Sequence, residues 1–167
     1  MVSGHPLRDG VVAGLVGAIS VAAWFFFLDI LAGRPFFTPA VLGAAVLQLV
    51  GGGFGGRGLV THVVVYTIVH VAAFIALGIV AAFASNALEL ERRPRGIIGF
   101  LALFAVLELA YLAAVGVAAA SELFGAYAWW QFGIANLIAA LLMGRYIWRS
   151  HHAKPFWQLR TLHEKQT

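Results

Sequence analysis

Four long apolar runs, separated by short polar connections, dominate the pattern of the chain. A helix needs roughly 20 mostly apolar residues to cross the ~30 Å hydrocarbon core of a bilayer. Each run is longer than this, with expected bounds at residues 10–33, 59–84, 96–120 and 126–148. The pattern predicts an all-α integral membrane protein in which four transmembrane helices form a bundle. The first run far exceeds the roughly 7–15 apolar residues of a signal-peptide core, so we expect it to be retained as a helix.

A fifth, shorter apolar piece lies between the first and second runs, over residues 39–50. Thr38 followed by Pro39 is a typical helix start, because the hydroxyl can cap free amides and proline is harmless at the first helical position. With only 12 residues, the piece is too short to cross a bilayer. We expect a short helix that lies in the membrane interface or enters it re-entrantly.

Small residues recur every fourth position along the first run, at Gly10, Gly14, Ala18 and Ala22. Such a stripe lets the backbone of another helix approach closely. It therefore predicts a packing face rather than a chemical site.

Composition agrees with a membrane protein, because 62% of the residues are hydrophobic, 11% are charged and the mean hydropathy is +0.90. Soluble domains average roughly 45–50% apolar and 25% charged residues. The absence of cysteine excludes disulfides, thiolate metal sites and thiol catalysis. The net charge of +4 comes from basic residues that flank apolar runs, so we assign it to membrane orientation and expect no nucleic-acid partner.

Positive charge is unequally distributed between the two ends of the predicted bundle. Four spans place both termini on one side, and nine Lys and Arg residues fall on that side against two on the other. The nine are Arg8, Arg92, Arg93, Arg95, Arg145, Arg149, Lys154, Arg160 and Lys165; the two are Arg34 and Arg57. By the positive-inside rule, both termini are cytoplasmic in a bacterial inner (plasma) membrane. Residues 1–149 then form the transmembrane domain, and residues 150–167 form a basic amphipathic cytoplasmic tail.

The second run contains no Asp, Glu, Lys or Arg, yet His62, Tyr66 and His70 recur in it every four residues. At about 100° per residue they form one polar seam along the helix. Polar side chains facing lipid are costly, so we expect this seam to face protein, a cavity or a cofactor.

Counting inward from the outer end of each span places the polar residues in two layers. A midplane layer holds His70, Glu108 and Asn136, which agree in depth within about 3 Å at 1.5 Å per residue, and Ser20 can add a hydroxyl. An outer layer holds Asp29, His62 and Gln131. Tyr66 lies between the layers, so a relay can be drawn in the order Asp29, His62, Tyr66, His70 and Glu108.

Two interpretations of these layers stay open. In the plainer one, the midplane groups are hydrogen-bonding contacts between helices, and a protonated Glu108 donates to His70 or Asn136. Asp29 is then hydrated at the interface or paired with Arg34. In the other, the groups transfer protons, bind a cofactor or contact another subunit.

Cofactor chemistry is restricted by the number of available ligands. His62 and His70 are the candidate cofactor-binding residues, but they lie about 12 Å apart on one helix and cannot ligate both faces of a haem within one monomer. A single intramembrane Glu excludes a di-iron carboxylate centre. No metal site is expected, and the sequence requires no cofactor.

The favoured function is an accessory or structural subunit of a larger inner-membrane complex, for instance a respiratory or photosynthetic energy-converting one. Its expected partners are the lipid bilayer and other membrane subunits or further copies of the chain. The absence of a catalytic triad or motif argues against an enzyme. One alternative is a small proton-coupled transporter or channel that uses the polar seam. Another is a haem-, quinone- or pigment-binding membrane protein.

Overall fold

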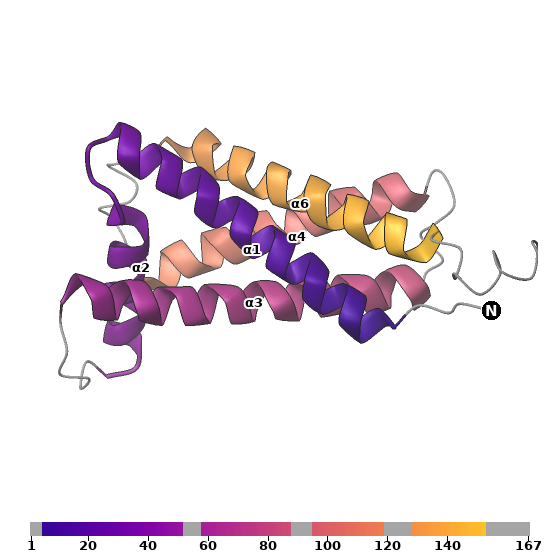
Figure 1. Cartoon of the computed structure of the whole chain (residues 1–167), viewed down its shortest axis with the longest axis horizontal. Coiled ribbons are helices and arrows are strands. Elements are labelled where there is room, and N and C mark those ends of the chain that lie inside the picture. The colour runs from indigo at the N-terminus through magenta and orange to yellow at the C-terminus, as the bar shows by residue number, and fades with distance from the viewer. Residues whose placement is uncertain (1–4, 52–57, 88–94, 119–127, 153–167) are drawn as a thin grey trace, which may run out of the picture.

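The computed structural model describes residues 5–51, 58–87, 95–118 and 128–152, and Figure 1 shows their arrangement. These parts contain five helices and no strand, which confirms the all-α prediction. The helices are α1 (Pro6–Leu31), α2 (Phe37–Leu49), α3 (Leu59–Ala87), α4 (Arg95–Ala118) and α6 (Trp129–His152). Of the predicted tail, only its first residues, up to His152, lie within the described part of the chain.

Helix α1 occupies the centre of the molecule, between α3 and α6 (Figure 1). It runs antiparallel to α3, because Gly10 meets Ile79 and Ala18 meets His70. Helix α4 packs against α6, and the short α2 lies across one end of the long helices. Long helices thus run side by side, with a short one across their end, and this arrangement produces the polar contacts between helices that are described below.

Glycines bring α1 and α3 into backbone contact. A Cβ atom on Gly78 of α3 would overlap the backbone of Gly10 and Gly14 on α1. Three members of the small-residue stripe, Gly10, Gly14 and Ala18, are buried, whereas Ala22 is exposed. Small residues thus let these two helices approach more closely than larger side chains would permit.

A second close approach joins α2 to α3. Gly43 of α2 lies against the backbone of His62, and a Cβ atom at that position would overlap the His62 carbonyl. Before α2, Phe36 adopts a left-handed conformation, with φ of 68°, where the chain turns out of α1. The turn directs α2 across the first turns of α3.

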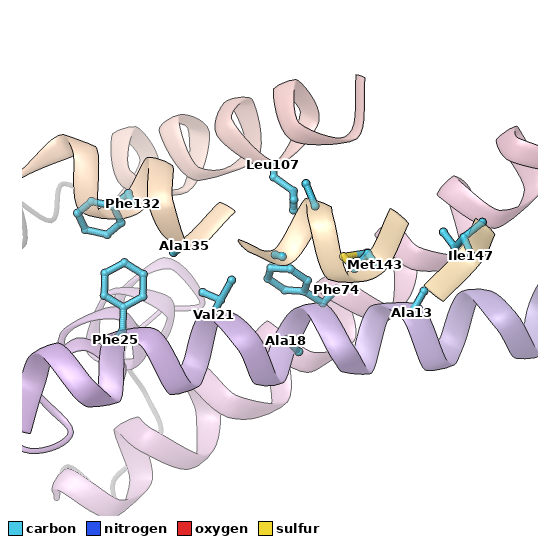
Figure 2. Packing of buried hydrophobic residues seen from close by; sticks show 12 residues of the cluster. Ala13, Ala18, Val21, Phe25, Phe74, Leu107, Phe132, Ala135, Met143 and Ile147 are labelled. Carbon is cyan, nitrogen blue, oxygen red and sulfur yellow. The ribbon is translucent and has the colours of Figure 1, made fainter. Parts of the chain in front are cut away.

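The core lies mainly between α1 and α6 and is built from small side chains with a few large ones (Figure 2). The Phe25 and Phe132 rings are tilted against each other with centroids 4.8 Å apart, and Met143 and Phe74 cover the bare face of Gly17. Ala13, Ala139 and Ala140 are fully buried among them. Contacts along both α1 and α6 fix their antiparallel alignment.

By length and composition, two of the described helices are able to cross a membrane, α1 and α3. In their most apolar stretches of 18 residues, 33% of α1 but only 11% of α3 is buried inside the protein. The other residues of α3 are exposed or half-buried, and the exposed ones are largely apolar. Shorter apolar helical stretches are Phe37–Leu49 in α2 and Ile98–Leu109 in α4.

Candidate functional site

The most deeply buried polar contact joins Asp29, near the end of α1, to Thr38, in the first turn of α2. The backbone N–H of Thr38 donates to Asp29 Oδ2 and its hydroxyl donates to Oδ1, both at 2.9 Å. Asp29 is 0% and Thr38 1% exposed. The residue at the usual capping position, Phe36, supplies no side-chain acceptor. Asp29, on α1, therefore accepts the hydrogen bond that a capping side chain at the start of α2 would otherwise accept. Its carboxylate also interacts favourably with the positive end of the α2 dipole.

Arg34 lies in the turn between these two helices. Its guanidinium carbon is 4.1 Å from the centroid of the Phe37 ring, a cation–π contact. The Arg34 backbone N–H donates to the Asp29 carbonyl, which closes the end of α1. Arg34 and Asp29 thus both stabilise the turn that leads into α2.

The polar seam of α3 forms a short hydrogen-bonded chain that ends on α1. His70 Nε2 lies 3.1 Å from the carbonyl oxygen of Ala18, and Tyr66 Oη lies 3.1 Å from His70 Nδ1. A carbonyl only accepts, so Nε2 must carry the proton in this contact. In neutral His70 the Tyr66 hydroxyl then donates to Nδ1. His70 is thereby held in one tautomer and links α3 to α1.

Three aromatic side chains follow one another along this face of α3. The rings of Tyr66 and His70 stack with centroids 5.0 Å apart, and His70 and Phe74 are tilted at 4.8 Å. Phe74 is buried at the other end of the row. Ring contacts on both sides leave the His70 ring little freedom to rotate.

The outer polar contact and the seam are electrostatically connected. The Asp29 carboxylate lies within range of the Tyr66 hydroxyl, with which it interacts electrostatically. Tyr66 is thus hydrogen-bonded to His70 and interacts with Asp29 through electrostatics alone among the contacts that the structure describes. Of the expected relay, the step from Tyr66 to His70 is a hydrogen bond in the structure.

Glu108 and Asn136 meet across α4 and α6. Asn136 Nδ2 donates to Glu108 Oε1 at 3.1 Å, and Gly133, one turn earlier on α6, leaves room for the carboxyl group. Asn136 is buried and Glu108 is half-buried. Here the amide donates to the carboxyl group, whereas the sequence suggested the opposite direction.

The structure brings together only part of the expected midplane layer. Glu108 bonds to Asn136, which joins α4 to α6, whereas His70 bonds to Ala18 and Tyr66, which joins α3 to α1. The midplane residues therefore connect two separate pairs of helices. Ser20 donates back to Gly17 within α1. The His70 to Glu108 step of the relay has no hydrogen bond in the described part of the chain.

The remaining members of the outer layer hold local structure. The side-chain oxygen Oε1 of Gln131 accepts a hydrogen bond from the Ala128 backbone N–H at the start of α6. The backbone carbonyl of Gln131 accepts one from Trp24 Nε1 on α1 at 3.0 Å. His62 is half-buried, with its backbone against Gly43. Neither residue joins Asp29 by a hydrogen bond that the structure describes.

Two partners in these contacts were not expected from sequence. Thr38 was identified only as a helix start, and its bond to an acid nine residues earlier was not expected. The Ala18 carbonyl carries no side-chain signal at all, since a backbone acceptor can be any residue.

Among the described residues, no group of three or more His, Asp or Glu side chains is placed to hold a metal ion. Comparison of the chain with known protein families, curated proteins and solved structures gave no match. The function is therefore argued from the geometry of the polar contacts.

Proposed function

We propose that the chain is an integral membrane protein with four transmembrane helices, α1, α3, α4 and α6. The lengths of the last two support this, because 24 residues extend about 36 Å at 1.5 Å per residue. Helix α6 packs against α1, which is apolar enough to cross a membrane by itself, and α4 packs against α6. Helix α2 then lies at the membrane surface, across the outer end of the bundle.

We also propose that both termini are cytoplasmic in an inner membrane. The start of α1, with Arg8, lies at the same end of the molecule as the end of α6, with Arg145 and Arg149 (Figure 1). Arg34 follows α1 at the opposite end, beside α2. The positive-inside rule places the end with more arginines in the cytoplasm.

Within that membrane, the proposed role is an accessory or structural subunit of a larger complex, an energy-converting assembly being one example. The observation that carries this proposal is that the polar groups join helices to one another. Asp29 bonds to Thr38, His70 to Ala18, and Asn136 to Glu108. In lipid, where apolar burial does not drive helices together, such contacts are the ones that hold a bundle in one arrangement.

The exposed surface of α3 supports a role in assembly. Ile68 and Val80 are each 64% exposed and belong to an apolar face that little else in the described chain covers. Lipid or a neighbouring subunit can cover such a face. A structural subunit would use it to pack against its complex.

Crosslinking in native membranes tests the proposal. A photoreactive amino acid at Ile68 of α3 should yield a heterologous adduct, and the same probe at Ile19, 66% exposed on α1, serves as the matched control for a different face. Copurification in mild detergent should retain the same partner. A tagged protein that runs as a lone monomer or homodimer, with no adduct from either position, contradicts the subunit role.

A second candidate function is proton-coupled transport, favoured by the path from Asp29 through Tyr66 to His70. Vesicles containing the purified chain would be assayed for flux driven by a pH gradient. Tyr66→Phe removes the hydroxyl that joins the path and should abolish the flux. Thr67→Val, which removes an exposed hydroxyl bonded within α3, should leave it intact. Absence of flux in the unmodified protein contradicts this candidate.

A further inference from the structure

Helix α6 carries an exposed stripe that changes in character along its length. Leu137, Leu141, Arg145 and Arg149 are all exposed and follow one another at intervals of four residues, which keeps them on one face. The opposite face of α6 packs into the core through Ala139, Ala140, Met143 and Ile147. The stripe is apolar toward the middle of the helix and basic toward its C-terminal end.

The change from apolar to basic falls at the depth of the inner membrane surface. Arg145 is 16 residues beyond Trp129, the first residue of α6, or about 24 Å along its axis. Within a hydrocarbon core of about 30 Å, its long side chain can extend to the inner headgroups, and Arg149 lies one turn further. Trp148, 54% exposed, lies beside them, as an aromatic residue at an interface does.

The two guanidinium groups have the chemistry of a phosphate site. Arginine presents a planar set of donors that matches phosphate oxygens, and two of them one turn apart can share one phosphodiester. No carboxylate forms an ion pair with either group among the residues that the structure describes. Their charge is therefore available to an anion from outside the protein.

We propose that this stripe binds an anionic phospholipid of the cytoplasmic leaflet. The phosphodiester lies between Arg145 and Arg149, and an acyl chain runs along Leu141 and Leu137. The proposal rests on the membrane placement proposed above, but not on membership of a complex. A lipid fits better than a free anion because basic and apolar positions are continuous on one helix face.

Binding would be measured on the purified full chain in mild detergent by native mass spectrometry. The probes are dioleoylphosphatidylglycerol, dioleoylphosphatidylcholine of equal acyl length, and inorganic phosphate. We expect selective retention of the anionic lipid. The double variant R145Q/R149Q should weaken it roughly thirtyfold, since each basic residue near the surface contributes about fivefold. The variant R8Q/R34Q removes the same charge from other exposed positions and should keep the selectivity.

Each of the other possible results contradicts the proposed lipid site. Equal retention of both lipids shows that no anionic selectivity exists, and equal losses in the two double variants show a diffuse effect of net charge. Saturation by inorganic phosphate at the same concentration shows an anion site without a lipid. Membrane placement is tested separately by the resistance of the unmodified chain to alkaline carbonate extraction, so failure of that placement is distinguishable from failure of the site.

Discussion

Asp29 receives two hydrogen bonds from Thr38, one from the backbone N–H and one from the hydroxyl, each 2.9 Å long. One residue belongs to α1 and the other to the first turn of α2, and both side chains are buried. The pair therefore fixes where the short helix lies on the long ones. It also gives a buried acid a structural role, which changes how the other polar groups between the helices are interpreted.

Asp29→Ala should lower the free energy of unfolding in detergent by about 2–3 kcal/mol, because a buried N–H and a hydroxyl lose a charged acceptor. Thr38→Val removes one of the two bonds and should cost about 1–2 kcal/mol. Chemical denaturation followed by circular dichroism measures both. In the double variant the losses should not add, since the two residues share one contact.

The control for this pair is Thr67→Val, because the Thr67 hydroxyl is exposed and bonds only to Val63 of its own helix. Its effect should stay within about 0.5 kcal/mol. Additive losses at Asp29 and Thr38 would show that the two residues act independently and would remove the capping role.

Gly78→Ala should disrupt the crossing of α1 and α3, since the new methyl group would overlap the backbone of Gly10 and Gly14. Overpacking of this kind costs roughly 1–3 kcal/mol. The comparison is Gly144→Ala on α6, where the nearest atom to a Cβ is 4.0 Å away on Phe100. That variant should be neutral or slightly stabilising, because alanine favours a helix. Thermal unfolding midpoints that fall equally in both variants would contradict the close crossing.

His70→Phe should loosen α3 from α1, because the ring loses its bond to the Ala18 carbonyl while the aromatic row from Tyr66 to Phe74 is kept. Hydrogen bonds between helices in membranes average about 0.6 kcal/mol, with a maximum near 1.7, so a loss in that range is expected. Tyr66→Phe leaves the His70 to Ala18 bond in place and should cost less. Hydrogen exchange at the α1–α3 interface shows which of the two variants loses more stability. A larger loss for Tyr66→Phe would show that the Tyr66 hydroxyl stabilises this interface more than the bond from His70 to Ala18 does.

The sequence predicted the helical class and a short helix near residues 39–50, because the length of each apolar run indicates the length of the helix that contains it. It also predicted a packing face at the small residues of α1, and the structure shows that α3 is the helix that packs there. Pairing was harder. Depth counting put His70 level with Glu108, but depth says nothing of which helices are neighbours, and α1 lies between α3 and α6. A seam can therefore end on a backbone carbonyl such as that of Ala18.

Glu108→Gln separates a structural role of this carboxyl group from a protonic one. Glutamine keeps an acceptor for Asn136 Nδ2, which is 3.1 Å from Glu108 Oε1, but it cannot ionise. If the pair only joins α4 to α6, stability should change by less than about 0.5 kcal/mol and copurification with any partner should be unchanged. Glu108→Leu should instead cost about 1–2 kcal/mol, because the buried Asn136 amide loses its acceptor. Normal assembly of the Gln variant together with loss of a proton-dependent activity would assign Glu108 to proton transfer instead. The two substitutions thus distinguish the roles through the same pair of atoms.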